Sequence, residues 1–529
     1  MDTKALRQKI LDLAIRGKLV PQDPNDEPAS VLLERTRAEK QQMVKDGKLK
    51  AKDIKNDTVI FKGDDNLHYE QFADGAVKCI EDEIPFELPE GWSWTRIQNI
   101  TQICLGLTHT PKYVESGIPF YSVKDISSGG LDTTNPKYIS AAEFEKFPDG
   151  AKPQYGDILF GRVGTLGKPT IVNTNSPFGI FVSLGFFRKY SHEITSEFFV
   201  HWMNSSLFWD QVNMNVKGAV LTNLNTGWLS KFLIPIPPSK EQTRIVAQCE
   251  IAIRYLEEIE NTGREISNLI SATKSKILDL AIRGKLVPQD PNDEPASVLL
   301  ERIRAEKEEL IKQGKIKRDK KESVIFKGDD NSYYLNKDGQ CVDIGDENPF
   351  DIPNSWEWTL LGNIVQLNPR NKISDDMEVS FVPMPLIDDG FSGNHASEIR
   401  KWNDVKTGFT HFAEGDIGVA KITPCFENRK STIFKNLCNG YGAGTTELHI
   451  LRTYADTISH KFLLSFVKTD YFIQAGKQTF SGAVGQQRIG KEYISNSLFP
   501  LPPLAEQKRI VNTIEALFAQ IDKISEQIS

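Results

Sequence analysis

A stretch of 32 residues occurs twice in this chain, almost unchanged. Residues 9–40 read KILDLAIRGKLVPQDPNDEPASVLLERTRAEK, and residues 276–307 repeat that string except that Thr36 becomes Ile303. The offset between the copies is 267 residues, about half of the 529 in the chain. An internal repeat of this kind constrains the fold strongly, because each copy represents one structural unit in an equivalent setting. The sequence therefore predicts two copies of one unit.

The repeat continues outside this block and is circular. VIFKGDDN at Val59–Asn66 returns at Val324–Asn331, and the Pro-Pro-x-x-Glu-Gln stretch of residues 232–246 returns at 497–511. In the first half the helix after this stretch continues into the second copy, whereas in the second half the chain soon stops at Ser529. Joining the two chain ends would rebuild the central helix. We therefore expect the terminal helices to imitate the central one, with an approximate two-fold axis.

The central helix carries the apolar rhythm of a coiled coil. From Ile245 to Leu280, positions spaced alternately four and three residues apart are mostly apolar, and they would form the contact seam of a coiled coil. The C-terminal helix from Ile510 and the N-terminal helix from Leu6 show the same rhythm. We expect the terminal pair to pack antiparallel on the central helix. The alternative is that these helices cover one sheet.

A second, highly charged helix is predicted in each copy, at Ala29–Asp46 and Ala296–Gln313. Glycine provides the stop signal, at Gly47 for the first helix and Gly314 for the second. Their near-identity favours two surfaces that fit the same kind of partner. Recent duplication without constraint is the alternative.

Between the repeated helical parts lie two blocks whose sequences differ almost everywhere. Each opens with a Trp-x-Trp signal and closes with a Pro-rich exit. Helices are expected at Ser196–Met214 and Ser459–Gly476. Short strands broken by Gly, Asn, Asp and Pro are expected around them, at Asp157–Phe160, Thr170–Val172, Ile180–Phe187, Val379–Val382, Ile417–Lys421 and Glu447–Leu451.

The predicted fold class is therefore α+β, with two globular α/β domains separated by long antiparallel coiled-coil helices in a circular pseudo-two-fold repeat. The domain boundaries that follow from the repeat are an N-terminal helical region at 1–82, a first block at 83–240, a central helical region at 241–347, a second block at 348–505 and a C-terminal helix at 506–529.

Composition is that of an ordinary globular protein, with 39% apolar and 26% charged residues. There is no apolar run of membrane length and no signal peptide, and the six cysteines are scattered, so we expect a cytoplasmic protein that meets no membrane. The net charge is −7, but the first block carries 13 basic and 13 acidic residues and the second 15 and 16. Any DNA affinity must therefore come from locally clustered charges or from a partner.

Motifs for catalysis are missing from the sequence. An Asn-Pro-Pro-Tyr methyltransferase signature, a Gly-rich cofactor loop and a phosphate loop are all absent, and the eight histidines lack metal or base spacing. The Gly-rich, basic stretch Gly161–Lys168 lacks phosphate-loop spacing. It fits either a basic turn that approaches a DNA backbone or a plain hairpin. We therefore expect no catalytic residue, metal or cofactor in this chain.

Taken together, these features resemble the specificity subunit of Type I restriction–modification systems, HsdS. The resemblance covers the whole chain and rests on the LPxGWxW-like entry at Leu88–Trp94, the IPxPPxxEQxRIV-like exits at Ile234–Val246 and Phe499–Val511, and the circular repeat. The entry is degraded in the second copy, where Ser355 stands in place of Gly91.

The resemblance implies a non-catalytic subunit in which each block is a target-recognition domain. It implies binding to double-stranded DNA at an asymmetric bipartite site, one half per domain, with a fixed gap. The partners would be two modification subunits that use S-adenosylmethionine to methylate adenine, and restriction subunits that use ATP and Mg²⁺ for translocation and cleavage. Two other functions remain open: a stand-alone methyltransferase or nuclease with its own recognition domains, and an assembly scaffold that does not bind DNA.

Candidate DNA-contacting residues follow from side-chain chemistry, since Arg, Lys, Asn, Gln and Thr read base edges and Lys and Arg bind phosphates. In the first block they are Thr108, Lys112, Lys124, Arg162, Lys168, Thr222, Asn223 and Asn225. In the second block they are Arg370, Asn371, Lys372, Lys421, Asn428, Arg429, Lys430, Gln486, Gln487 and Arg488. The last run aligns with the polar stretch at 222–225, which makes both more credible.

Overall fold

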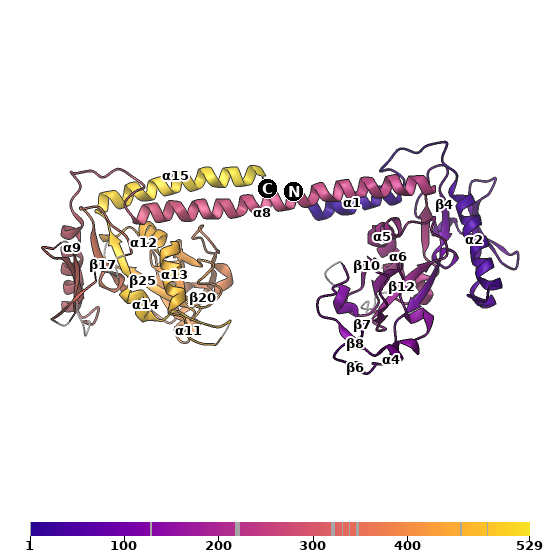
Figure 1. The fold of residues 1–529 in the computed structure, drawn as a ribbon. Coiled ribbons are helices and arrows are strands. Elements are labelled where there is room, and N and C mark those ends of the chain that lie inside the picture. The colour runs from indigo at the N-terminus through magenta and orange to yellow at the C-terminus, as the bar shows by residue number, and fades with distance from the viewer. Residues whose placement is uncertain are drawn as a thin grey trace. The chain divides into compact units, whose positions relative to one another are not determined.

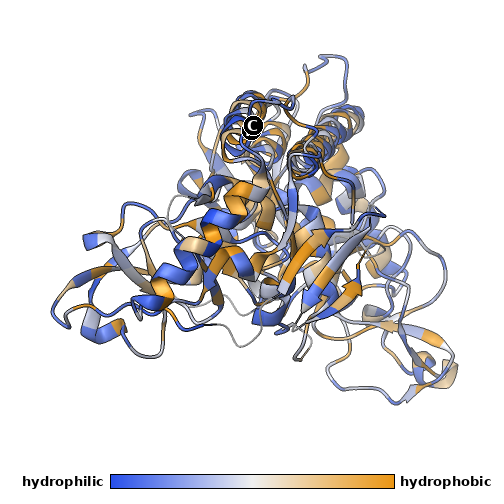
Figure 2. Cartoon of the chain, turned by 90° about the vertical axis from the view of Figure 1, so that its left-hand side faces the viewer, coloured by the Kyte–Doolittle hydropathy of each residue, from blue (hydrophilic) through white to orange (hydrophobic). Residues whose placement is uncertain are grey.

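The computed structural model describes residues 2–126, 130–216, 223–318, 323–330, 332–337, 339–344, 349–454, 457–483 and 485–528. The chain divides into two compact units, residues 1–262 and 263–529, near its middle (Figure 1). No described helix is both long and apolar enough to cross a membrane. Coloured by hydropathy, helices carry hydrophilic and hydrophobic residues in alternation, as helices with one buried face do (Figure 2).

Unit 1 combines a helical scaffold, a small outer sheet and the first block. The scaffold helices are α1 (Thr3–Ile15), α2 (Ala29–Lys45) and the first part of α8 (Ser239–Ile282). The outer sheet has the order β1-β2-β3 (Thr58–Lys62, His68–Phe72, Val77–Cys79), and β4 (Ser93–Arg96) pairs with β13 (Leu233–Ile236). The block contains helices α3 (Ile97–Ile100), α4 (Ala141–Glu145), α5 (Ser196–Asn204), α6 (Ser206–Val216) and α7 (Thr226–Leu229).

Two four-stranded sheets form the first block. The first has the order β10-β9-β12-β5 (Gly167–Ile171, Ile158–Gly161, Leu184–Lys189, Thr101–Leu105). The second has the order β11-β7-β8-β6 (Gly179–Ile180, Ile118–Tyr121, Lys137–Ile139, Tyr113–Val114).

Unit 2 repeats this plan in a circularly permuted order. Its scaffold consists of the last part of α8, α9 (Ala296–Lys312) and α15 (Leu504–Ile528). The outer sheet is β14-β15-β16 (Ser323–Lys327, Tyr333–Lys337, Gln340–Asp343), and β17 (Glu357–Leu360) pairs with β26 (Leu498–Leu501). The block contains helices α10 (Leu361–Ile364), α11 (Trp402–Val405), α12 (His460–Val467), α13 (Asp470–Gln478) and α14 (Lys491–Asn496).

The second block also has two four-stranded sheets, with nearly the topology of the first. One has the order β18-β25-β22-β23 (Val365–Leu367, Leu448–Thr453, Ile417–Ala420, Ser431–Ile433), the counterpart of β5-β12-β9-β10. The other has the order β20-β19-β24-β21 (Glu398–Lys401, Glu378–Val382, Tyr441–Gly444, Thr410–Ala413). Strand β19 pairs in parallel with β24, as β7 does with β11. The two sequences therefore build one architecture despite having little in common.

In each unit a terminal helix packs antiparallel on its part of α8. In unit 1 an ion pair joins Arg7 to Glu257 at 3.4 Å, and Ile10 of α1 packs in the core that holds Ile245 and Cys249. In unit 2 Lys274 pairs with Asp522 at 2.5 Å. The antiparallel packing predicted from the apolar rhythm is confirmed.

Burial along the α8 seam is uneven. Ile245, Cys249 and Leu256 are buried, and so is Ile277 near the other end, but Ile259 is 45% exposed. The continuous apolar seam expected from Ile245 to Leu280 is therefore wrong in its middle. Leu6 of α1, one residue before the partner of Glu257, is itself 39% exposed, so this part of α1 does not bury the middle of α8.

The Glu-Gln motif at the start of α8 and α15 ties helix, strand and block together. Gln242 accepts a hydrogen bond from the Thr195 backbone N–H at 2.9 Å and donates to the Pro237 carbonyl at 3.1 Å. Gln507 makes the same two bonds, to Ser459 N–H and the Pro502 carbonyl. Thr195 and Ser459 are the N-caps of α5 and α12. The motif is thus a structural joint.

The Gly-Asp-Ile sequence shared by the two blocks marks a buried ion pair. The guanidinium group of Arg188 donates hydrogen bonds to the Asp157 carboxylate, with Nη2 2.7 Å from Oδ2. Arg452 binds Asp416 in the same way and at the same distance. The two aspartates are 5% and 3% exposed. The preceding glycines both have φ of +84°, a left-handed turn that favours glycine.

Three predicted elements are each split in two. Residues 196–214 form α5 and α6, because the backbone at Ser205 is extended and its hydroxyl donates to the Trp202 carbonyl. Residues 459–476 form α12 and α13, because Thr469 caps a new helix. The predicted strand 180–187 divides into β11 and β12. The predicted helices 29–46 and 296–313 are confirmed, and their glycine stops have φ of +71° and +69°.

Candidate nucleic-acid interface

In unit 1 the structure brings Arg162 together with the polar run that follows α6. The hairpin after β9 meets this run through a β-bridge between Val163 and Asn223, and Leu224 N–H donates to the Arg162 carbonyl at 2.9 Å. Gly161 pairs with Gly167 across the turn, so the Gly-rich stretch is a hairpin. Candidate Thr222 lies outside the described residues.

Unit 2 makes the same junction with different side chains. A β-bridge joins Ile422 to Arg488, and Ile489 N–H donates to the Lys421 carbonyl at 3.0 Å. Thr423 N–H donates to the Gln487 carbonyl at 2.9 Å. The alignment of the two polar runs inferred from the sequence is confirmed, since each run meets the turn after the equivalent strand, β9 or β22. We call these two places the polar junctions.

Arg488 is fixed in orientation at its polar junction. Its Nε donates to Glu447 Oε2 and its Nη2 to Glu447 Oε1, both at 2.9 Å, and Nη1 donates to the Gln486 carbonyl at 2.8 Å. The hydrogen bonds from Arg488 lower the pKa of Glu447, so the carboxylate stays charged at neutral pH. The Arg488 side chain remains 40% exposed, which leaves part of its fork free for an external acceptor.

A basic pocket lies beside this junction. Arg370, Lys421, His411 and His449 line it. Burial lowers the pKa of both histidines, so they are neutral at neutral pH and the positive charge comes from Arg370 and Lys421. In unit 1, Lys124 lines a separate pocket with Thr110, Tyr113 and Phe120.

Other candidates in the first block lie on exposed loops. Thr108 and Lys112 are exposed between β5 and β6, and Lys168 is exposed on β10 with a φ of +52°. Asn225 caps α7, because its side-chain oxygen accepts the Gly227 N–H at 2.8 Å. Contact of these residues with DNA stays a prediction.

In the second block three candidates are held by internal contacts. Asn371 donates to the Phe412 carbonyl and accepts from Arg452, and Lys430 donates to the carbonyl of Ile387 at 2.8 Å. Arg429 donates to the Lys468 carbonyl at 2.9 Å and pairs with Asp470. These contacts give all three a structural role. Lys372 and Asn428 are exposed, Gln486 and Gln487 lie in the polar junction, and DNA contact by each stays a prediction.

Among the described residues one group has the chemistry for a metal ion, His68, Glu81 and Glu87. His68 Nδ1 already lies 2.8 Å from Glu81, and Glu87 is paired with Lys62 at 3.1 Å. In unit 2 Tyr333 occupies the place of His68, opposite Lys327 as His68 is opposite Lys62. The group is therefore specific to one unit and is satisfied by internal pairs.

A family profile described as the Type I restriction modification DNA specificity domain matches residues 89–266 and again 353–529, about two-thirds of the chain. The chain belongs to this specificity family. Each match covers one block with its Trp-x-Trp entry and its exit helix. Residues 1–88 and 267–352, which hold the outer sheets and both copies of the 32-residue repeat, lie outside it.

Relatives within the specificity family are similar to different extents. A 259-residue segment is 48% identical to the EcoAI specificity subunit of Escherichia coli, covering 49% of this chain but only 41% of that protein. The EcoBI specificity subunit of E. coli is 28% identical over 475 residues, covering 87% of this chain and 86% of that protein. A solved chain from a study of complex assembly and conformational transition of the type I R-M system shares the fold, with a TM-score of 0.52 at 17% identity over 84% of this chain and 94% of that chain.

Sequence reasoning missed several residues that shape the polar junctions. Glu447 orients Arg488, Thr423 accepts the Gln487 N–H through its hydroxyl at 3.1 Å, and His449 contacts the Ile489 carbonyl. Neither an acidic residue nor a histidine in a neutral block suggests DNA binding by itself. The only signal was position, since Glu447 begins the predicted strand that ends at Leu451.

Proposed function

We propose that this chain is the DNA-reading subunit of a Type I restriction–modification complex, in which each unit reads one half of an asymmetric bipartite site. The observation that carries the proposal is the pair of polar junctions. They occupy equivalent places in two blocks of one architecture, yet present Arg162 and Asn223 in one and Lys421, Gln487 and Arg488 in the other. Equivalent frames with unlike polar side chains suit two different half-sites.

Two repeated scaffolds support docking of two copies of a modification subunit. The contacts of Gln242 and Gln507, and of the antiparallel helices, recur in both units. In this proposal methylation and cleavage belong to the partner subunits, which hold S-adenosylmethionine, ATP and Mg²⁺. The role of this chain is binding and positioning.

The deciding experiment is co-expression with a cognate modification subunit, followed by mapping of methylated adenines across host DNA. We expect a split, asymmetric motif with a constant gap. A stable complex that adds no methylation would contradict the DNA-reading role and favour a plain scaffold. Methylation or cleavage by the purified chain alone with S-adenosylmethionine and Mg²⁺ would make it a stand-alone enzyme instead.

The gap between half-sites offers a second test. Helix α8 runs without interruption through 44 residues from unit 1 into unit 2. We propose that its length sets the gap. Insertion of about four residues near Gly263, roughly one helical turn, should change the preferred gap while both half-sites stay the same. An unchanged gap would refute this part of the proposal.

A further inference from the structure

A groove between the second scaffold helix and the strands occurs in both units, lined by matching residues. In unit 1, Leu33 and Arg37 of α2 face Thr58 and Val59 of β1 and Thr95 of β4. The corresponding residues of unit 2 are Leu300, Arg304, Ser323, Val324 and Thr359. We call these the arginine grooves. Most of each lies outside the span of the family profile, so it is an addition to the common specificity domain.

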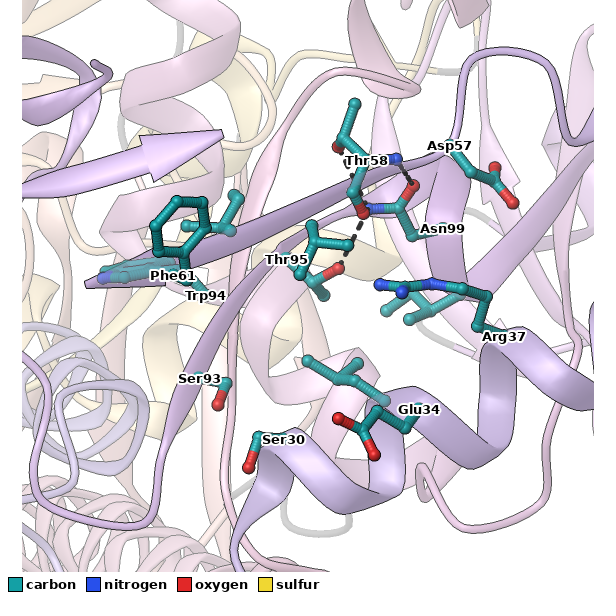
Figure 3. A pocket seen from close by; sticks show the side chains of 14 residues that line it. Ser30, Glu34, Arg37, Asp57, Thr58, Phe61, Ser93, Trp94, Thr95 and Asn99 are labelled. Carbon is teal, nitrogen blue, oxygen red and sulfur yellow. Dashed lines mark hydrogen bonds between the residues drawn. The ribbon is translucent and has the colours of Figure 1, made fainter. Parts of the chain in front are cut away.

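The arginine of each groove forms no ion pair with a described residue, although its charge acts on a nearby carboxylate, Asp57 for Arg37 and Glu357 for Arg304. Arg37 reaches from α2 into the groove (Figure 3), and neither Arg37 nor Arg304 makes a hydrogen bond or ion pair with any described residue. The neighbouring arginines of the same helices are paired, Arg35 with Glu193 at 2.5 Å and Arg302 with Glu294. An unpaired guanidinium in a half-enclosed groove is a ready site for a carboxylate, which it can bind through two parallel hydrogen bonds.

The strand that forms one wall of each groove is an outer strand of its sheet, and an asparagine side chain occupies edge groups of its first residue. Asn99 donates to the Thr58 carbonyl at 3.0 Å and accepts its N–H at 3.1 Å, and Asn363 donates to the Ser323 carbonyl at 2.9 Å. These bonds show that Thr58 and Ser323 face away from β2 and β15. By the alternation of an antiparallel strand, Ile60 and Ile325 face the same way, and β1 and β14 are the outer strands of their sheets. Beyond the groups that Asn99 and Asn363 occupy, such an edge can accept an added extended segment.

Internal contacts do not explain why these helices stayed identical. The repeated loop before each helix is fixed by its own unit, since Gln22 bonds Glu241 and Gln289 bonds Glu506. On the helices, however, Ser30 and Glu34 are exposed, as are their copies Ser297 and Glu301. Surface residues that make no internal contact tolerate change readily. Their identity in both copies suits a single partner that meets both grooves.

We propose that each arginine groove binds an extended acidic segment of the modification subunit, one copy per groove, with a carboxylate on Arg37 or Arg304 and main-chain hydrogen bonds to the edge of β1 or β14. The inference rests on the proposed function, because it assigns the docking surface for the partner that the function requires. It also explains why two copies enter the complex.

The two grooves should differ in strength. Glu357 of unit 2 stands at the strand position of Ser93 in unit 1, since these residues pair with Leu501 and Ile236 in equivalent ladders. The charge of Arg304 acts on Glu357, which forms no ion pair with a described residue, whereas Asp57, the carboxylate on which Arg37 acts, is already paired with Lys40 at 2.5 Å. A carboxylate of the chain near Arg304 competes with an incoming one. We therefore expect tighter binding in the groove of Arg37.

Charge reversal in one groove at a time tests the proposal by stoichiometry. Purified modification subunit would be titrated into the full chain and its copies counted by native mass spectrometry. Arg37→Glu and Arg304→Glu should each reduce the count from two to one, and the double variant should bind at least about tenfold more weakly. The control is Lys45→Glu with Lys312→Glu, equivalent exposed residues of the same helices outside both grooves, which should keep two copies.

Two further measurements keep the test decisive. If charge reversal lowers the melting temperature, the neutral pair Arg37→Gln and Arg304→Gln replaces it and should still weaken binding. A photo-crosslinking residue at Phe61 or Phe326, both 41% exposed on the edge strands, should capture a partner peptide rich in Asp or Glu. Two copies bound to the double variant with unchanged affinity, or crosslinks only to peptides without acidic residues, would overturn the inference and leave the proposed function standing. A wild-type chain that binds no modification subunit would overturn both.

Discussion

The scaffolds of the two units share most of their sequence, whereas the blocks of the two units share little. Their scaffolds are alike residue by residue, so that Arg244 meets Asp26 in one and Arg509 meets Asp293 in the other. Their blocks share the strand order of one sheet, a parallel strand pair in the other and a buried Asp–Arg pair, but almost no other side chains. The comparison shows that two kinds of constraint act here. The scaffold is fixed at the level of individual contacts, whereas the blocks are fixed only in architecture, which frees their polar junctions to diverge.

The buried ion pairs provide the strongest test of equal architecture. Asp157→Ala and Asp416→Ala should each destabilise their own unit by about 3 kcal/mol, because an arginine partner is left without its counter-charge. Scanning calorimetry of the full chain would measure the loss. Asp375→Ala, which removes a surface pair with Lys406, should cost under about 1 kcal/mol. A large loss in only one unit would show that the blocks are less alike than their topology.

The Glu-Gln joint tests the equivalence of the scaffolds. Gln242→Leu and Gln507→Leu should each cost about 2 kcal/mol, because a helix-capping N–H and a proline carbonyl lose their buried partner. Both variants should shift the urea midpoint by the same amount. Lys240→Leu and Lys508→Leu, which replace exposed lysines on the same two helices, serve as controls. Unequal shifts would show that the glutamine contributes differently to the stability of the two units.

The polar junctions test the difference between the units. Arg488→Ala should weaken discrimination at one base pair of one half-site by about 1–2 kcal/mol and leave the other half-site unchanged. Competition binding by the assembled complex, with singly substituted DNA sites, would measure it. Arg400→Ala, an exposed arginine of the same block, should leave base preference unchanged. A uniform loss on all sites would mean that Arg488 binds a phosphate.

The smallest effect is expected where the 32-residue repeat has its one difference. Thr36 is buried and its hydroxyl donates to the Leu32 carbonyl. The equivalent Ile303 is also buried, but its apolar side chain has no polar group that requires a hydrogen bond. Thr36→Ile should change the free energy of unfolding by under about 1 kcal/mol, because added apolar burial offsets the lost hydrogen bond. The reverse change, Ile303→Thr, should destabilise by a little more. Thermal melting of both variants would check the order, and a reversed order would show that the two sites are packed differently.

Several parts of the structure were predictable because they depend on residues close together in the chain. Helices 29–45 and 296–312 follow from local composition and from their glycine stops. The antiparallel packing of α1 and α15 on α8 follows from an apolar period in three helices. The breaks at Ser205 and Thr469 were missed, since a hydroxyl can lie inside a helix or cap one, and only the surrounding packing decides between them.

The candidate interface was predictable in part. The pairing of the polar runs with each other came from the Gly-Ala that precedes each of them in the sequence, at residues 218–219 and 482–483. The structure joins each run to the turn that bears Arg162 or Lys421. The internal roles of Asn371, Arg429 and Lys430 could not be foreseen. Their partners lie tens of residues away in the sequence, and a basic or amide side chain that binds a distant carbonyl looks the same in sequence as one that faces solvent.

The sequence alone determined that the chain has two equivalent units, which helices form their scaffold, and that the blocks between them carry no familiar catalytic motif. These properties follow from repeats, apolar periodicity and motifs, which can be read directly from the order of residues. The tertiary structure decided the strand order that one sheet of each block shares, the orientation of Arg488 by Glu447 and the matching grooves in which Arg37 and Arg304 form no ion pair with a described residue. Each of these depends on contacts between residues far apart in the chain, and such contacts are set by packing and by the pairing of buried charges.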